Sequence, residues 1–330
     1  MNSSALGVRF ADAELEESVR VGLEAVEAAL LQATESDDEF VADAARYLAE
    51  AGGKRFRPLL CVLASHFGDP SRPEIVPAAV VVELTHLATL YHDDVMDEAR
   101  VRRGEQSANA RFDNSVAILV GDFLFSRASD LLADLGPYAV RLQARTFGRL
   151  VTGQIRETVG PREGVDPIDH YLAVLADKTG SLIATSAEFG AHFAGVDPTL
   201  SATLRRYGEQ IGVAFQLSDD ILDIASDSQE SGKTPGTDLR EGVATLPVLY
   251  AMRRSDASGA QLRSVLGGPM DDDAVASALA LLRSSPAMDE ARTTTRGYAD
   301  AARSELAHLP DVPARQALEA LCDLVTDRTS

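Results

Sequence analysis

The stretch VVELTHLATLYHDDVMD, residues 81–97, decides how this chain folds. It lies in an apolar segment that predicts one long helix from Pro73 to Ala99, and it ends in Asp93, Asp94 and Asp97. Asp93 and Asp97 are four residues apart and therefore share a helix face, where like charges repel each other. The partial negative charge of a helix C-terminus makes this place still less favourable for carboxylates. The stretch therefore predicts a buried helix that carries an unfavourable cluster of carboxylates at its end.

A second segment, SDDILD at residues 218–223, repeats the pattern behind another apolar helix. Asp219 and Asp223 share a face there, and Asp220 lies between them. One such motif in an acidic protein is more simply interpreted as a solvated helix end, but two of them behind buried helices favour cation binding. Oxygen ligands with no Cys or His cluster nearby indicate Mg²⁺ or Mn²⁺.

The rest of the chain also has the 3.6-residue periodicity of helices, and β-branched alternation is rare. The other predicted helices are 12–33, 38–51, 57–67, 115–135, 137–159, 168–193, 199–225 and 245–254, followed by roughly four more that end near Val325. The polar segment 226–242 is expected to be a loop that closes over a site. No shift in composition marks a domain boundary, so we expect one all-α domain over residues 1–330, a bundle of about a dozen helices.

Composition excludes several classes of protein. The net charge of the 330 residues is −20, which argues against a nucleic-acid surface. The N-terminal residues lack the basic and apolar regions of a signal peptide, and the longest apolar run, 76–82, is cut by Glu83. We therefore expect a cytoplasmic protein with no transmembrane segment. Two cysteines, Cys61 and Cys322, cannot form a disulfide framework and are expected in the core.

Lysine is rare and occurs only where glycine is adjacent or nearby. The three lysines are Lys54, Lys178 and Lys233, and the other 28 basic residues are Arg. A lysine is a compact point charge, so three of them beside flexible backbone suggest binding of phosphate-like anions. Arg102 and Arg103 follow the first aspartate motif and add to these positions. Because Mg²⁺ completes its shell with phosphate oxygens, the residues predict a substrate with a diphosphate head and an apolar tail.

The motifs GGKRFRP, LTHLATLYHDDVMDEARVRRG, LVGDFL, KTG, FQLSDDILD and GKTPGTDLREGVATLP occur in this order from about residue 40 to residue 250. In this combination the chain resembles the trans-isoprenyl diphosphate synthases, also called polyprenyl synthetases. The resemblance implies an isoprenoid synthase-like helical bundle around a central cavity and a homodimer. It also implies condensation of isopentenyl diphosphate with an allylic diphosphate of farnesyl or geranylgeranyl type.

The resemblance also assigns roles to residues. Asp93, Asp94 and Asp97 would hold two Mg²⁺ ions, and Asp219, helped by Asp220 and Asp223, would hold a third. The allylic diphosphate would also be bound by Arg102, Lys178 and Lys233, and isopentenyl diphosphate by Lys54, Arg57, His86 and Arg103. Thr179 and Gln216 would line the space in which the allylic cation forms.

For other residues near these motifs we expect a place in the structure without a direct part in the reaction, or a departure from the family pattern. Arg55 is expected at the surface, and His92 is expected to make a structural hydrogen bond rather than to bind metal. Gln154 and Glu157 are expected to face the cavity. Val243 stands where the family often has a lysine, so one diphosphate contact is missing or comes from elsewhere, for instance from Arg240.

Residues below the first motif bear on product length. Ala88 and Thr89 lie five and four residues before Asp93, one helical turn below the predicted metal site. Members of the family with short products tend to have bulky aromatic residues here, so two small residues predict a medium-chain or long-chain product. The helix continues back for about 19 residues, or ~28 Å, enough for about six extended isoprene units. If Phe123 or Phe125 forms a floor, geranylgeranyl diphosphate would be the product instead.

Two other functions remain open. A class I terpene cyclase shares the fold and the first motif but usually carries an Asn/Ser/Glu metal motif in place of a second DDxxD, which is present here at Asp219 to Asp223. A non-catalytic subunit of a heteromeric synthase tends to lose the aspartates, and all six are present.

Overall fold

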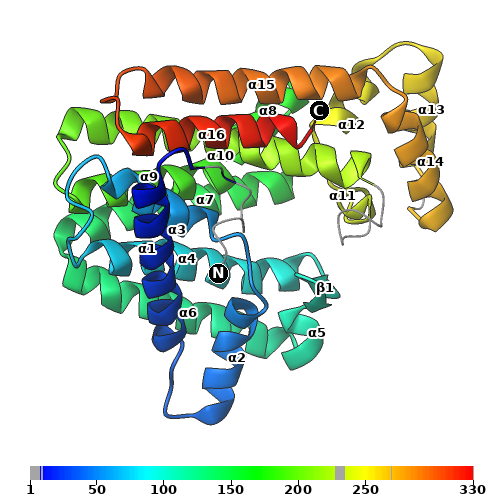
Figure 1. The fold of residues 1–330 in the computed structure, drawn as a ribbon. Coiled ribbons are helices and arrows are strands. Elements are labelled where there is room, and N and C mark those ends of the chain that lie inside the picture. The colour runs from blue at the N-terminus through cyan, green and yellow to red at the C-terminus, as the bar shows by residue number, and fades with distance from the viewer. Residues whose placement is uncertain (1–7, 9, 227–234, 269, 330) are drawn as a thin grey trace. The chain divides into compact units, whose positions relative to one another are not determined.

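The structure is a computed structural model that describes residues 8, 10–226, 235–268 and 270–329. These residues are overwhelmingly helical, which confirms the predicted all-α class (Figure 1). The elements are α1 (Ala13–Ala33), α2 (Glu39–Glu50), α3 (Phe56–Ser65), α4 (Ile75–Met96), β1 (Val101–Arg102), β2 (Glu105–Gln106), α5 (Ala108–Phe112), α6 (Asn114–Leu135), α7 (Pro137–Val159), α8 (Pro167–Leu175), the π-helical turn η2 (Ala176–Gly180), α9 (Ser181–Phe193), α10 (Pro198–Ala225), α11 (Thr237–Arg240), α12 (Leu246–Arg253), α13 (Ala257–Leu266), α14 (Asp272–Arg283), α15 (Ala287–Leu306) and α16 (Pro313–Asp327).

The chain divides into two compact units. The first unit comprises Met1–Gly148, Leu182–Gly208 and Glu305–Ala320. The second unit comprises Arg149–Ser181, Glu209–Ser304 and Leu321–Ser330. The expectation of one domain over residues 1–330 stays a prediction.

Helix α4 is the centre of the first unit, where α1, α3 and α6 pack against it. Its buried side chains include Val80, Val81 and Val82, three consecutive residues that lie on different faces of the helix. The approach of α6 depends on Gly121, because a Cβ atom there would lie 2.3 Å from Nε2 of His92. This glycine therefore lets α6 lie directly against the end of α4 that carries the first aspartate motif.

Helix α4 is also the one helix in the described residues that is long and apolar enough to cross a membrane. Of its most apolar segment, 67% is buried inside the protein, as in the core helix of a folded domain. The apolar run is longer than residues 76–82 suggested because Glu83 does not interrupt it. That carboxylate is 2% exposed and pairs with Arg55, so the helix keeps it inside the core.

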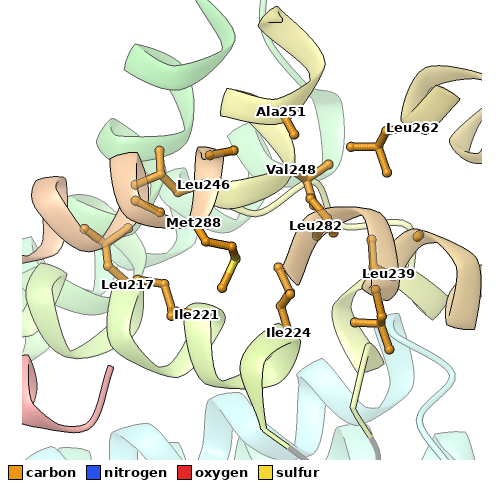
Figure 2. Packing of buried hydrophobic residues seen from close by; sticks show 14 of the residues in the cluster. Leu217, Ile221, Ile224, Leu239, Leu246, Val248, Ala251, Leu262, Leu282 and Met288 are labelled. Atoms are coloured by element: carbon orange, nitrogen blue, oxygen red, sulfur yellow. The ribbon is translucent and has the colours of Figure 1, made fainter. Parts of the chain in front are cut away.

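The second unit has its own hydrophobic core (Figure 2). Leu217, Ile221 and Ile224 of α10 pack there with Leu246 and Val248 of α12. Other members come from α8, α13, α14 and α15, and all are almost completely buried. This core supports the last turns of α10, which carry the second aspartate motif.

Most predicted helices agree with the structure to within two or three residues, and α7 has the predicted bounds. Local signals explain this accuracy, as at α1, where Asp12 accepts a hydrogen bond from the Leu15 amide and caps the helix. The prediction missed α5 and the β1–β2 hairpin, and it missed the π-helical turn within 168–193. It was wrong for 237–240 of the predicted loop, which form α11, whereas 227–234 lie outside the described residues.

Candidate active site

The first aspartate motif forms the C-terminal end of α4. Asp97 is the C-cap residue, and its amide donates to the Asp93 carbonyl oxygen at 2.8 Å. Asp93 and Asp97 are partly exposed, whereas Asp94 is fully buried. The three carboxylates, predicted as one metal-binding group, are therefore in two different environments.

Asp94 connects the helix end to the hairpin that follows it. Its Oδ1 accepts a hydrogen bond from Nε of Arg102 at 2.6 Å, and its Oδ2 accepts one from the Ala108 amide at 2.9 Å. The hairpin turn consists of Arg103 and Gly104, both with positive φ, as a type I′ turn requires. Asp94 thus places Arg102 beside the motif, with Nη2 of Arg102 3.9 Å from Oδ2 of Asp97.

The next residue, Arg103, points to a different partner. Its Nη1 donates to the Leu48 carbonyl oxygen at 2.6 Å and also to the Gly52 carbonyl oxygen. Gly52 opens the GGKRFRP motif, so the hairpin separates two neighbouring arginines. Arg102 contacts the first aspartate motif, and Arg103 binds backbone carbonyl oxygens in and before the glycine-rich loop.

Arg55 in that loop is buried, so the expectation that it lies at the surface was wrong. Its side chain is 7% exposed and makes a two-pronged ion pair with Glu27 at 2.8 and 2.9 Å. Nη1 of Arg55 is 3.0 Å from Oε1 of Glu83, which lies on α4. The loop sequence gave no sign of this because both carboxylates are 28 residues away in the chain.

These arginines create a strongly positive environment around His86. Burial lowers the pKa of His86 well below its usual value, and the neighbouring positive charges of Arg57, Arg103 and Arg102 lower it further. Burial also lowers the pKa of Arg57 to about 10, although Glu83 opposes the shift. Nε of Arg57 is buried with no hydrogen-bond partner among the described residues. The first unit therefore holds a neutral imidazole among several arginine side chains.

Other predicted residues of the first unit lie along α4 and its loops. Nε2 of His92 is 3.1 Å from the Ile118 carbonyl oxygen, which confirms the expected structural hydrogen bond. Ala88 is fully buried, and Thr89 is half-buried with its hydroxyl donating to the His86 carbonyl oxygen. Lys54 is exposed.

The second aspartate motif lies at the end of α10 in the second unit. Nη2 of Arg328, just past α16, is 2.6 Å from Oδ1 of Asp219, and the guanidinium lies over the ring of Phe215. Asp223 accepts hydrogen bonds from the amides of Thr237 and Asp238, both at 3.2 Å. Asp223 thus caps the first turn of α11.

Both carboxylate oxygens of Asp220 accept hydrogen bonds from side chains of the second unit. The Tyr171 hydroxyl donates to its Oδ2, and Nε2 of Gln216 donates to its Oδ1 at 3.0 Å. The Thr179 hydroxyl donates to Oε1 of Gln216 at 3.5 Å, so the predicted pair Thr179 and Gln216 lies together. Burial raises the pKa of the Asp220 carboxyl to about 7, even though these two hydrogen bonds favour the charged form.

Lys178 projects from the π-helical turn. Its Nζ lies 2.6 Å from Oε2 of Glu157 on α7. A Cβ atom at Gly153 would lie 2.7 Å from the Lys178 backbone nitrogen, so this glycine lets α7 contact the turn directly. Asp177 accepts hydrogen bonds from Arg149 and Arg156, which fasten the turn to α7. Such π-helical turns are frequent at functional sites.

The contacts described above do not include two other basic residues singled out in the sequence, Lys233 and Arg240. Lys233 lies outside the described residues. Arg240, considered as a substitute for the family lysine at Val243, donates to the Pro235 carbonyl oxygen at 2.8 Å and pairs with Asp272 at 3.0 Å. The sequence motifs did not reveal Tyr171 and Arg328, since neither lies in a motif and each meets its aspartate only through the fold.

The donors fit divalent cations of the oxygen-preferring kind. Asp93 and Asp97 form one carboxylate pair, and Asp219 and Asp223 form another at the end of α10. Within the residues that the structure describes, three or more His, Cys, Asp or Glu side chains do not gather as a metal site. A cation at either pair would need water or substrate oxygens to complete its shell, as Mg²⁺ commonly does.

Comparison with known proteins gives one family. The model of the polyprenyl synthetase family matches residues 38–282. The nonaprenyl diphosphate synthase of Mycobacterium tuberculosis is 52% identical over 324 residues, 98% of this chain and 97% of that protein. The octaprenyl diphosphate synthase of Escherichia coli is 33% identical, over 92% of this chain and 94% of that protein.

Solved structures agree with the sequence comparisons. The crystal structure of geranylgeranyl pyrophosphate synthase from Corynebacterium glutamicum, complexed with calcium and isoprenyl diphosphate, matches with a TM-score of 0.88 at 48% identity. The match covers 98% of this chain and 100% of that one. The fold is therefore the all-α fold of these synthases, as predicted. On sequence and on fold, the chain belongs to the polyprenyl synthetase family.

Proposed function

We propose that the chain is a magnesium-dependent trans-polyprenyl diphosphate synthase. It would extend an allylic diphosphate of farnesyl or geranylgeranyl type with isopentenyl diphosphate and release a medium-chain or long-chain product. The observation that carries this proposal is the 52% identity, over 98% of the chain, to a nonaprenyl diphosphate synthase. Both aspartate motifs are intact within that matching length.

In this proposal, isopentenyl diphosphate binds to basic residues of the first unit. Arg57, Arg103 and His86 lie in one positive environment, and Lys54 is an exposed cation on the same glycine-rich loop. An anion that enters this environment gains attraction from several buried charges at once. The neutral His86 would act as a hydrogen-bond donor to a phosphate oxygen.

Asp93 and Asp97 would hold two Mg²⁺ ions, and Asp219 with Asp223 a third, with Mn²⁺ as an alternative ion. When bound, these ions neutralise the negative charge that develops on the departing diphosphate. Asp94 and Asp220 have both carboxylate oxygens engaged by protein donors, which suits them to orienting the motif. Arg102, Lys178 and Lys233 would bind the same diphosphate through charge-assisted hydrogen bonds.

The chain's own residues then have three tasks during the reaction. The cations Arg102 and Lys178 stabilise the leaving diphosphate as the allylic carbon–oxygen bond breaks. The polar oxygens of Thr179 and Gln216 would face the allylic cation, and water must be excluded because it would capture that cation. The double bond of isopentenyl diphosphate attacks the cation, and the released diphosphate takes the proton.

Geranylgeranyl diphosphate synthase is the second candidate, because the structurally similar protein from Corynebacterium glutamicum is a geranylgeranyl pyrophosphate synthase. The nonaprenyl and octaprenyl relatives favour the longer product. We further propose that the enzyme is cytoplasmic and works as a homodimer.

One assay tests the reaction class and the product together. The purified chain is incubated with labelled isopentenyl diphosphate, Mg²⁺, and geranyl, farnesyl or geranylgeranyl diphosphate, and the products are separated by reversed-phase chromatography. We expect products longer than C20 and no product after chelation with EDTA. A product that stops at C20 supports the second candidate. If the pure chain is inactive with every primer, it is a subunit of a heteromeric synthase, and a cyclic hydrocarbon product would identify a terpene cyclase.

A further inference from the structure

Asp220 is the most constrained carboxylate of the second aspartate motif. Its side chain is 6% exposed, and donors from two helices engage both of its oxygens. Tyr171 on α8 donates to Oδ2, and Gln216, one turn earlier on α10, donates to Oδ1. A carboxylate held on both oxygens cannot turn without breaking a hydrogen bond, so Asp220 fixes the groups around it.

Tyr171 is itself fixed. Its side chain packs against the hydrophobic core of the second unit, which includes Leu217, Ile221 and Leu246 (Figure 2). Its hydroxyl also accepts a hydrogen bond from the Leu246 amide at the start of α12. The hydroxyl therefore connects the N-terminus of α12 to Asp220, and its position is set by both α8 and α12.

The consequence extends to Gln216. The NH₂ group of Gln216 donates to Oδ1 of Asp220 at 3.0 Å, so the carbonyl oxygen of the same amide faces away from Asp220. The other end of the amide, Oε1, then points to the Thr179 hydroxyl, which is the arrangement observed. Asp220 thereby decides which end of the Gln216 amide is presented on the side of Thr179.

The other aspartates of the second motif, Asp219 and Asp223, are neighbours of the contact between Tyr171 and Asp220. Gln216, Asp219, Asp220 and Asp223 are spaced i, i+3, i+4 and i+7, so all four lie on one face of α10. The contact between Tyr171 and Asp220 therefore adds a fixed point on the helix face that carries Asp219 and Asp223.

We propose that Tyr171 is a positioning residue of the prenyl transfer, since its hydroxyl fixes Asp220 and through it the Gln216 amide, on the helix face that also carries Asp219 and Asp223. The inference rests on the proposed function, in which these groups face metal and allylic cation. Tyr171 itself contacts neither. It acts by keeping the acceptors of α10 in one orientation before the substrate arrives.

The test is Tyr171→Phe, which removes the hydroxyl and keeps the ring in the core. We expect kcat to fall by about 10- to 100-fold, the range typical of groups that orient metal ligands. The Mg²⁺ concentration for half-maximal activity should rise, and KM for isopentenyl diphosphate should stay unchanged because its proposed ligands belong to the first unit. Binding of Mn²⁺ in the presence of inorganic diphosphate, followed by electron paramagnetic resonance, should weaken in parallel.

Tyr250→Phe is the matched control. Tyr250 also packs against the hydrophobic core of the second unit, and its hydroxyl is 2.8 Å from Oγ1 of Thr294. Both variants should lower the melting temperature similarly, but only Tyr171→Phe should change kcat and Mn²⁺ binding. Wild-type kcat and Mn²⁺ binding in Tyr171→Phe, or equal losses in both variants, would overturn the inference. An inactive wild-type chain would instead contradict the proposed function, and Mn²⁺ binding would then still decide the role of Tyr171.

Discussion

His86 lies among Arg55, Arg57, Arg102 and Arg103, and these charges with its burial keep its imidazole neutral. Glu83, fully inside the core, pairs with Arg55 and also attracts Arg57 and Arg103. Glu27 also pairs with Arg55 and Asp94 with Arg102, so a local excess of positive charge remains at Arg57 and Arg103, which share the influence of Glu83. That excess is unfavourable in the free protein and becomes favourable when a diphosphate binds.

The neutral state of His86 predicts how stability depends on pH. The unfolded chain binds a proton at His86 near the usual pKa of 6.5, whereas the folded chain resists that proton. Stability should therefore fall as pH drops below 6.5, by up to about 1.4 kcal/mol per pH unit from this group. His86→Gln removes that loss, which urea unfolding at pH 7 and pH 5.5 can measure. If the variant and the wild type lose equal stability, His86 is not held neutral.

Ala88 predicts control of product length. Its replacement by Phe places a ring one turn below Asp93, which should block the growing tail and shorten the product by one or more isoprene units. Chromatography of the products, with the melting temperature as a check on folding, measures the effect. Ala133→Phe, at an exposed position of α6, should leave the product unchanged. Because Ala88 is buried, Thr89→Phe is the second variant, and unchanged length in both would contradict the proposed path of the tail.

The contact between helix α7 and the π-helical turn η2 fixes the position of Lys178. Gly153→Ala would force a Cβ atom to 2.7 Å from the Lys178 backbone nitrogen, and the turn must move away. We expect activity to fall at least 10-fold as the ion pair of Lys178 with Glu157 is displaced. Gly148→Ala, on the same helix with nothing within 4 Å of its Cβ, should instead stabilise the protein by about 1 kcal/mol. Steady-state kinetics and thermal unfolding of both variants measure these effects, and wild-type activity in Gly153→Ala would contradict them.

Arg328, just past α16, is expected to compete with a metal ion for Asp219 of the second aspartate motif. Arg328 pairs with Asp219 at 2.6 Å, so a metal ion that uses Asp219 must displace a positive charge. Arg328→Gln should therefore lower the Mg²⁺ concentration for half-maximal activity, by roughly the few-fold expected for a partly exposed ion pair. Arg303→Gln, which breaks a more exposed pair with Asp323 of α16, is the control and should not change it. A higher Mg²⁺ requirement in Arg328→Gln would show that Arg328 supports the site instead.

For the molecule as a whole, exposed apolar side chains predict self-association. Ile118 and Leu119 of α6 are 43% and 65% exposed in the single chain, and burying each would contribute about 1.5–3 kcal/mol. We expect sedimentation equilibrium to give twice the chain mass of 35.2 kDa. The double variant Ile118→Lys and Leu119→Lys should sediment as a monomer, whereas Val21→Lys on α1 should remain dimeric. A wild-type monomer would contradict the proposed homodimer.

The positions of the helices follow from the sequence alone, because periodicity and capping are local properties of the chain. Asp12 before α1 and the apolar pattern of α7 are sufficient to place those elements. The sharing of a face by Asp93 and Asp97 is equally local, since four residues make about one helical turn. The β1–β2 hairpin escaped prediction because its two-residue strands carry little alternation, and its turn places Arg103 at a positive φ that is unusual for that residue.

The partner of each charged group depends on how distant parts of the chain pack together. Tyr171 meets Asp220 across 49 residues of chain, and Arg328 meets Asp219 across 109. Arg55 became a buried residue through Glu27 and Glu83, each 28 residues away. A motif records which residue types are present, but burial and partners depend on how helices pack. That packing buried Asp94 and Asp220 and left the other aspartates of the two motifs partly exposed.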